Sequence, residues 1–424
     1  MQKLLFILGM YYPRYSANGL CSKNVIDKCV SEGFDVICIV NADSKCSDGE
    51  VINGARVYRI KPRLYYRISE WCEYHPDSHK RQLLLIVAKT LNRLKLALMS
   101  PFWPLIAPLY TYRFYKKARA LHKKEHFDVV IAIYTPIDSL LGGHLLKRKY
   151  PEIKFIPYYL DALAGGWGPM KWNMRKREKH TRKWEELINR NADLVISMES
   201  SKQYHSQNPI SLMKIIHRCF LDTPMFLPTE TQVKIESDGV SHITRALFAG
   251  SIHYPQRNPL PLLEIITRVC HLCDIEFIFV GACNVTHLFQ KYSEQSSGRI
   301  KHLGKYQHEQ VLKLEETANF FINIGSTNPF TIPCKIFEYM RFRKPIISSY
   351  AIEDEPSIPY LKKYNHIFLV DERSADIESI AQKLACFIKE NKNANIELGS
   401  FKKDFYANTP EAFVQKIRET LEAK

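Results

Sequence analysis

A buried strand, a small polar loop and a helix make up residues 320–340 (FFINIGSTNPFTIPCKIFEYM). Pro333 opens the helix, where its missing N–H is not needed, and the unpaired amides of a helix start can bind an anion. Lys335 in the first turn opposes the helix dipole, so it predicts an anionic partner. Glu338, one turn later, suits hydrogen bonds from ligand hydroxyls. The alternative is a solvated Lys335–Glu338 pair at i, i+3 spacing, which would contribute only about 0.2–0.5 kcal/mol.

Three more junctions between a strand and a loop carry glycine or arginine. Gly250 follows a predicted strand at 246–249, and Arg257 precedes the next helix. The planar guanidinium of arginine suits a diphosphate, because it forms bidentate hydrogen bonds. Gly281 and Gly304 follow two further strands, where a backbone without side chains can approach a ligand. Since parallel strands end at one edge of a sheet, we expect all four junctions to form one site.

The elements that position these residues read as alternating strands and helices. Their continuous apolar runs predict parallel sheets covered on both faces. In the first half we expect strands at 4–8, 35–40, 55–60, 128–134, 154–159 and 193–197, and helices ending near residue 31 and at 139–149 and 181–192. In the second half we expect strands at 246–249, 275–280, 300–303, 320–324, 345–349 and 366–370, and helices from about 259 and at 308–317, 333–341 and 410–422.

A stretch rich in Pro, Ser, Asp and Gly separates the halves and predicts a linker. The expected organisation is an amino-terminal domain at 1–222, a linker at 223–242 and a carboxyl-terminal domain at 243–408. A terminal helix at 409–424 would pack back on the first domain. Two doubly wound α/β sheets of this kind bind a ligand in a cleft between the carboxyl ends of their strands.

The spacing of these motifs resembles the carboxyl domain of glycosyltransferase family 4, which has the GT-B fold. The matching second-half segments are FAG ending at Gly250, FVG at Gly281, HLG at Gly304, PCKIFEYM at 333–340 and RKPII at 343–347. The first half is similar to the family more loosely, at YYPRYSANG (11–19), YYLD (158–161) and ADLVIS (192–197). The resemblance implies two Rossmann-like, doubly wound domains that face a central cleft.

The resemblance also implies roles for residues. Arg257, Lys335 and the helix start at Pro333 would hold the diphosphate of a nucleotide-sugar donor, and Glu338 its ribose hydroxyls. Asp161 would lie near the acceptor, with a strand-end cap as the alternative, and Gly19 would let the first loop approach the transferred group. The remaining implied donor contacts are Gly250, Gly281, Gly304, Tyr306 and Asn328. The family retains anomeric configuration, commonly without a metal, and the leaving phosphate can take the acceptor proton.

The chain departs from the common family pattern at two positions. A second glutamate usually lies eight residues before the one at 338, and here that residue is Phe330. The basic residue that often follows the strand-end glycine is Ser251. The Pro-x-Lys-x-x-Glu-Tyr variant is typical of enzymes that build surface polysaccharides, so these departures do not imply an inactive protein.

The net charge of +16 is concentrated in two segments. Residues 79–125 hold eleven Lys or Arg against one Glu, and residues 171–183 hold seven against one. Apolar residues recur at helical spacing over 83–98, next to a Pro-broken aromatic stretch. This pattern predicts a basic face lying on an anionic membrane, with a core helix as the alternative. A nucleic-acid binder would spread its basic residues along a groove, so we expect none bound.

Composition places the chain in a reducing compartment without a membrane span. Eleven cysteines without scaffold spacing favour free thiols in a cytosol. Mean hydropathy is −0.25, which argues against a polytopic membrane protein. The apolar start reads as a buried strand, because a cleavage site for a signal peptide is missing. We therefore expect a cytoplasmic protein peripherally associated with the inner membrane.

Together these features predict a retaining enzyme that moves a sugar from a nucleotide-sugar to a hydroxyl of a lipid-linked glycan or oligosaccharide. Its expected setting is surface polysaccharide synthesis, such as lipopolysaccharide or capsule, with neither cofactor nor metal. One alternative is a GT-B sugar-nucleotide epimerase, which needs no acceptor. Another is a catalytically silent, membrane-associated assembly subunit, which would bind no nucleotide.

Overall fold

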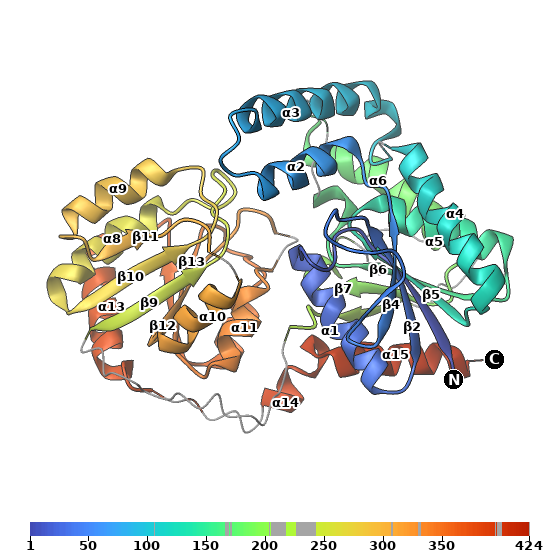
Figure 1. Ribbon diagram of the computed structural model, residues 1–424. Helices are drawn as coiled ribbons and strands as arrows, with labels where there is room; N and C mark the ends of the chain where they lie inside the picture. Colours follow the sequence, from blue (N-terminus) through green and yellow to red (C-terminus); the bar gives the residue numbers. More distant parts are fainter. Residues whose placement is uncertain are drawn as a thin grey trace. The chain divides into compact units, whose positions relative to one another are not determined.

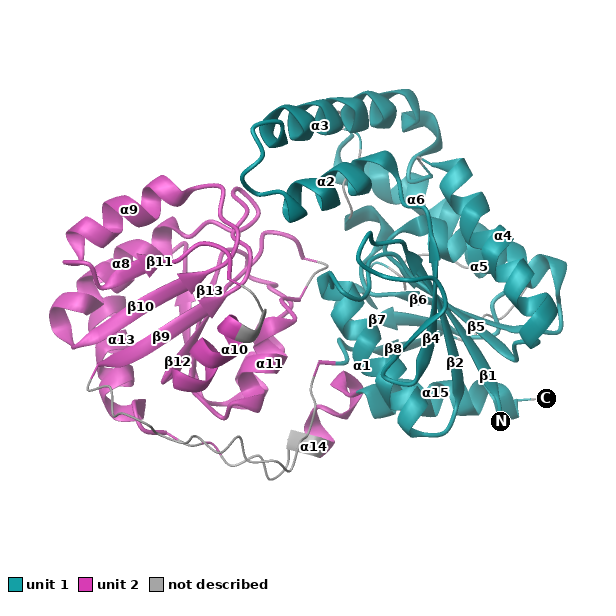
Figure 2. Cartoon of the chain, in the orientation of Figure 1, with its two compact units in different colours: residues 1–224, 410–424 teal, residues 225–409 magenta. Residues whose placement is uncertain are grey.

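The computed structural model describes residues 1–105, 107–165, 169, 172–202, 204, 218–225, 243–306, 308–329, 332–394, 396 and 401–423, with backbone alone at 308, 309, 401 and 402. The chain forms two compact units (Figure 2). Unit 1 contains Met1–Pro224 and Pro410–Lys424, and unit 2 contains Met225–Thr409. Most of the expected linker, residues 226–242, lies outside the described residues.

Unit 1 is built on an eight-stranded sheet in the order β3-β4-β2-β1-β5-β6-β7-β8. All neighbours pair in parallel except β3 and β4, which are antiparallel. The strands are β1 (Lys3–Ile7), β2 (Asp35–Asn41), β3 (Glu50–Ile52), β4 (Ala55–Ile60), β5 (Val129–Tyr134), β6 (Lys154–Tyr159), β7 (Val195–Met198) and β8 (Arg218–Leu221). The helices are α1 (Ala17–Ser31), α2 (Leu64–Tyr74), α3 (Arg81–Leu98), α4 (Pro108–Glu125), α5 (Ile137–Lys149), α6 (Met174–Asn189) and α15 (Pro410–Glu422).

Neighbouring residues of β6 show why these strands are apolar throughout. The Tyr159 hydroxyl donates to Asn189 Oδ1 of α6 at 2.8 Å on one face of the sheet. The Tyr158 ring lies 4.8 Å from the ring of Phe413 of α15, on the other face. Successive strand residues point to opposite faces of the sheet. A sheet that has helices on both faces therefore needs apolar side chains at every strand position. Figure 1 shows α4 and α5 on one side of the sheet and α1 with α15 on the other.

Unit 2 repeats this design with a parallel six-stranded sheet in the order β11-β10-β9-β12-β13-β14. Its strands are β9 (Thr244–Ala249), β10 (Ile275–Val280), β11 (Ile300–His302), β12 (Phe320–Ile324), β13 (Ile346–Tyr350) and β14 (Ile367–Asp371). Its helices are α8 (Leu260–Leu272), α9 (Thr286–Gln295), α10 (His308–Thr317), α11 (Lys335–Arg341), α12 (Ile358–Tyr364), α13 (Ile377–Asn391) and α14 (Phe401–Asp404). Phe320 packs on Phe387 of α13, whereas Phe321 stacks on Tyr339 of α11, so both faces are again covered.

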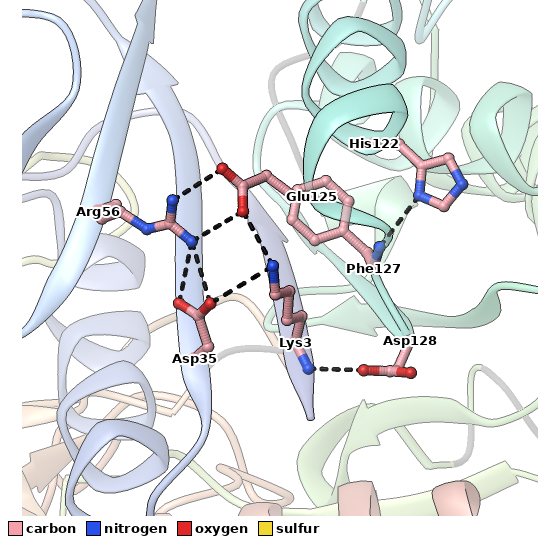
Figure 3. Close-up of polar contacts among 7 residues, drawn as sticks. All are labelled: Lys3, Asp35, Arg56, His122, Glu125, Phe127 and Asp128. Atoms are coloured by element: carbon pink, nitrogen blue, oxygen red, sulfur yellow. Dashed lines mark hydrogen bonds and ion pairs between the residues drawn. The ribbon is translucent and has the colours of Figure 1, made fainter. Parts of the chain in front are cut away.

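A polar network closes the edge of the unit 1 sheet where the strands begin (Figure 3). Arg56 of β4 bridges Glu125, at the end of α4, and Asp35, at the start of β2, with N–O distances of 2.8 and 3.0 Å. Lys3 of β1 also pairs with Glu125, at 3.1 Å. Hydrogen bonds from Arg56 and Lys3 lower the pKa of Glu125 to about 2. This edge is therefore held by structural ion pairs, and the opposite edge carries the strand ends that can meet a ligand.

The two parallel sheets confirm the predicted fold class, and several element boundaries differ. The helix expected at 181–192 begins at Met174, because the Asn173 side chain caps it by accepting a hydrogen bond from the Lys176 amide at 2.9 Å. Helix α11 begins at Lys335 rather than at 333. Elements that we did not predict are β3, β8, α2, α4, α9, α12, α13 and α14, together with 3-10 turns at Ser100–Phe102, Leu163–Gly165, Glu199–Ser201 and Tyr406–Asn408.

Candidate functional site

A pocket of about 550 Å³ lies at the carboxyl ends of the unit 2 strands. Three loops form it, those after β9, β10 and β11, together with α10 and α11. Its lining residues are Ala249, Gly250, Ser251, His253, Val280, Gly281, Ala282, Lys305, Tyr306, Val311 and Lys335. Four of the predicted donor contacts thus line one cavity: Gly250, Gly281, Tyr306 and Lys335.

Glycine is required where these loops meet. A Cβ on Gly281 would lie 1.8 Å from the carbonyl oxygen of Gly250, and the φ of Gly281 is +137°. The Gly281 amide donates to the Gly304 carbonyl at 2.7 Å, and the Gly250 amide donates to Val280 at 2.9 Å. Backbone therefore packs directly on backbone from β9 to the end of β11. This contact brings the three predicted glycines together, and Gly250 and Gly281 expose backbone to the pocket.

Lys335 lies between two buried carboxylates. Its ammonium nitrogen is 2.9 Å from Glu315 Oε1 and 2.8 Å from Glu338 Oε2. Glu315 is fully buried on α10, and only 6% of Glu338 is exposed. The anionic partner that a lysine in the first turn of α11 predicts is thus supplied by the protein itself. The i, i+3 pair of Lys335 with Glu338 that we considered as the alternative does form, but it is not solvated, because Glu338 is buried.

Lys335, Glu315 and Glu338 form a triad with one basic and two acidic side chains, so the acidic groups are in excess. Burial raises the pKa of Glu315 to about 7, and the neighbouring Glu338 adds to that rise against the opposing effect of Lys335. The two carboxylates raise the pKa of Lys335, although burial opposes them. Glu315 Oε2 is buried without a hydrogen-bond partner among the described residues. The triad therefore holds a charged lysine and one carboxyl that takes a proton near neutral pH.

The other predicted residues of unit 2 do not line the pocket. Arg257 donates from Nη1 to the Ser251 carbonyl at 3.1 Å, which holds the loop after β9. Burial lowers the pKa of Arg257, and it forms no ion pair with a described carboxylate. Pro333 is buried, and the Asn328 amide donates to Ser326 Oγ at 3.1 Å.

The start of α11 is less open to an anion than its sequence predicts. The amide of Ile336 donates to the Pro333 carbonyl, and that of Phe337 donates to Cys334, both at 3.2 Å. Tyr339 anchors the helix to the sheet, because its hydroxyl accepts from the Ala249 amide at 2.9 Å. The lysine side chain, and not these two amides, is what α11 presents to the pocket.

Sequence reasoning missed Lys305 and Glu315. Lys305 directly follows Gly304, so the same strand-end rule would have found it. Glu315 lies within helix α10, ten residues after Lys305. Its burial depends on how α10 packs beside α11. Only its position in an otherwise amphipathic helix hints at the site, and that signal is weak.

In unit 1, Asp161 comes just after β6, at the same edge as the ends of β1 and β5. Its Oδ2 accepts from Asn18 Nδ2 at 3.2 Å, and Asn18 also donates to the Tyr134 carbonyl at 3.3 Å. Burial raises the pKa of Asp161 to about 6, against the opposing hydrogen bond from Asn18. Gly19 lies in the first turn of α1, where a Cβ would be 2.4 Å from the Met10 carbonyl oxygen.

Helix α3 exposes an apolar row. Its exposed large residues are Leu83, Ile86, Val87, Leu91, Leu94 and Leu98, and Ala88 is its only buried residue. Lys89, Arg93 and Lys95 are exposed on the same helix. The core helix that we considered for this segment is wrong, because a core helix would bury this row. No helix in the described part of the chain is both long and apolar enough to cross a membrane.

Comparisons with solved structures show the fold. A glycosyltransferase from Rickettsia africae superposes with a TM-score of 0.62 at 13% identity, over 100% of this chain and 99% of that one. Anabaena HepE in complex with UDP and glucose gives 0.61 at 16%, over 100% of both chains. The lipopolysaccharide outer core galactosyltransferase WaaB, in its apo form, gives 0.54 at 13%, over 99% of both. These likenesses confirm the GT-B fold. No sequence model of a protein family and no curated protein matches the chain.

Proposed function

We propose that this chain, which has the GT-B fold, is a retaining glycosyltransferase that uses a nucleotide-sugar donor. The observation that carries the proposal is the pocket at the ends of β9, β10 and β11, where Gly250 and Gly281 join the lining and Lys335 contributes a half-buried cation. Its acceptor is a hydroxyl of a lipid-linked glycan in surface polysaccharide synthesis. HepE holding UDP and glucose, and WaaB acting on lipopolysaccharide, support this choice among GT-B chemistries.

The donor diphosphate lies beside Lys335 and Arg257 in this proposal. Arg257 donates one N–H to the Ser251 carbonyl. The planar guanidinium group suits bidentate hydrogen bonds to phosphate. Glu338 orients Lys335 and accepts hydrogen bonds from the donor ribose. A cation held in place by Glu315 and Glu338 stabilises the negative charge that builds up on the leaving diphosphate. Catalysis then comes from positioning and electrostatics, and we propose that it needs no metal.

The acceptor side of the reaction belongs to unit 1. Asp161 positions the acceptor hydroxyl by hydrogen bonding, and Asn18 fixes the carboxylate for that task. The leaving phosphate takes the proton of the acceptor, and the new bond forms on the face that the diphosphate leaves. Gly19 allows the loop after β1 to approach the transferred sugar.

The apolar row of α3 docks on an anionic lipid surface at the cytoplasmic face of the inner membrane. Exposed leucines flanked by lysine and arginine are the composition of helices that lie in a bilayer interface. Each basic residue near anionic lipid contributes about 1 kcal/mol. Docking there brings the enzyme to an acceptor that is held in the membrane by its lipid.

The donor site is tested by thermal shift with UDP, GDP, CDP and ADP, each with and without magnesium. One diphosphate at about 100 times its Kd should stabilise the chain by about 2.7 kcal/mol. The shift should disappear in Lys335→Ala and persist in Lys383→Ala, which removes an exposed lysine of α13. A donor turned over without any acceptor would instead favour the epimerase, and no shift with any nucleotide would favour a silent assembly subunit.

Membrane docking is tested by flotation with phosphatidylcholine vesicles that contain or lack phosphatidylglycerol. We expect binding only with the anionic lipid, and weaker binding at high salt. The double variant Leu91→Glu/Leu94→Glu should lose binding. Val51→Glu is the matched control, since Val51 is 67% exposed on β3, away from α3. Equal binding of neutral and anionic vesicles would contradict this part of the proposal.

A further inference from the structure

A second pocket, of about 250 Å³, lies in unit 1 at the carboxyl ends of β1, β2 and β4. We call it the tyrosine pocket. It is lined by Met10, Tyr11, Tyr12, Arg14, Asn41, Ala42, Asp43, Pro62, Tyr65, Tyr66, Ser69 and Glu73. Its walls are the loop after β1, the loop after β2 and one side of α2. None of the residues to which we assigned donor or acceptor roles lines it.

Four tyrosines line the tyrosine pocket. Tyr11 is only 3% exposed, and its hydroxyl is buried near Cys38, Tyr15 and Asp27, none of which lines the cavity. Three further tyrosines surround the cavity with aromatic faces, and Tyr12 is 40% exposed. Such rings can cover the apolar C–H face of a sugar.

The charged groups around this pocket are mainly acidic. Arg14 Nε is 2.7 Å from Asp43 Oδ2, and its Nη1 and Nη2 lie 3.0 and 3.6 Å from Glu73 and Glu70. Hydrogen bonds from the Lys45 amide, Arg14 and Tyr74 lower the pKa of Asp43, although burial opposes them.

Asp43 therefore stays ionised at neutral pH. Arg14 is already paired with three carboxylates, and the other nearby cation, Lys45, lies over the outer ring of Tyr74 at 4.0 Å. Three acids against two bases disfavour a phosphate or an acidic sugar. Carboxylates accept hydrogen bonds from hydroxyls and pair with ammonium groups.

We infer that the tyrosine pocket binds the terminal sugar of the acceptor, and that this sugar is a neutral or amino-bearing pyranose. The inference rests on the proposed function and names the acceptor class that it left open. The volume of 250 Å³ lies just below the range for drug-sized ligands, so it suits a single ring. Helix α2, which forms a wall of the pocket, packs against α3, whose apolar row is exposed. A lipid-linked glycan can thus keep its lipid at α3 while its sugar enters beside α2.

The test is saturation-transfer NMR on the full chain with single sugars as probes. Methyl glucoside, methyl galactoside and N-acetylglucosamine represent neutral sugars, and glucosamine represents amino sugars. Glucuronic acid and glucose 6-phosphate represent acids. We expect transfer to at least one neutral or amino sugar and none to the acids. Tyr11→Phe removes only a hydroxyl that is buried outside the cavity, so it should leave sugar binding unchanged.

Two further variants locate the signal. Tyr66→Ala should abolish transfer, and Tyr112→Ala, which removes a 55% exposed tyrosine of α4, should leave it unchanged. The UDP-glucose thermal shift, measured on the same samples, reports donor binding and folding separately. Transfer to the acids, transfer that survives Tyr66→Ala, or no transfer to any sugar would each overturn the inference. If UDP-glucose also fails to bind wild type, the proposed function fails, whatever the sugars show.

Discussion

Glu315 couples the charge of the pocket in unit 2 to pH. Its pKa is raised to about 7 by burial, so its ionisation costs stability as pH rises through neutrality. A donor diphosphate next to Lys335 would add negative charge within the same cluster. Glu315 would then hold its proton more tightly, so donor binding should take up a proton and weaken as pH increases.

We therefore expect the Kd for UDP-glucose to rise between pH 6 and 8.5, by at most about tenfold per pH unit for one proton. Glu315→Gln should make the Kd nearly independent of pH over that window. Calorimetry with UDP-glucose is the measurement, because a terminal phosphate, as in UDP, itself titrates near pH 6. Glu316→Gln, which changes the exposed neighbour, is the control and should keep the wild-type slope. A flat wild-type curve would contradict the coupling.

Asp161 combines a raised pKa with a proposed role in catalysis. Its folded-state pKa is about 6, above the ordinary value for aspartate, so its stabilising protonated form is lost as pH rises from about 4 to 6. Asp161→Asn removes the free-energy cost of ionising this buried carboxyl, so it should raise Tm at pH 8 and change Tm little below pH 4. The rise should be about 2–4 °C for each kcal/mol of unfolding free energy gained. The same variant should lower kcat by about 10²-fold, because the acceptor hydroxyl loses the carboxylate that positions it. Asp77→Asn, at an exposed site, should change neither Tm nor kcat.

Among the elements, the junction of β9 and β10 depends most on a missing side chain. Gly281→Ala would place a Cβ 1.8 Å from the Gly250 carbonyl oxygen and force a left-handed φ on alanine. We expect a loss of more than about 2 kcal/mol of stability, together with weaker donor binding. Gly298→Ala is the matched control, since Gly298 has φ +77° but open space around its Cβ position. It should cost only about 1–2 kcal/mol in denaturant unfolding and leave the donor Kd unchanged.

Helix α3 shows the limit of periodicity as a guide at the scale of elements. The spacing of its apolar residues predicted an amphipathic helix, and the structure has that helix at Arg81–Leu98. The same spacing is expected of a helix that packs into a core. Which side of the helix meets the protein depends on how α2 and α3 pack together, and that information is distributed over both helices.

At the scale of the whole molecule, unit 1 is completed by the end of the chain. Helix α15 packs on α1, and Phe413 is 1% exposed beside Tyr158. Phe413→Ala should cost about 3–5 kcal/mol, the usual cost of removing a buried aromatic side chain. Hydrogen exchange should then accelerate in α1 and leave β10 of unit 2 protected, because the two units have separate cores. Leu272→Ala, at a 41% exposed residue, should do neither.

The sequence determined the six-stranded sheet of unit 2, six of the eight strands of unit 1 and part of the pocket in unit 2. Continuous apolar strands that alternate with helices are typical of covered parallel sheets, and glycines that follow parallel strands lie at one edge of the sheet. Gly250, Gly281 and Gly304 were therefore predictable from local sequence. Only the tertiary structure decided the partners of Lys335, the exposed face of α3 and the tyrosine pocket. Glu315, Tyr11 and Tyr66 come from different elements, and their burial and contacts depend on packing between helices and loops, which no local pattern encodes.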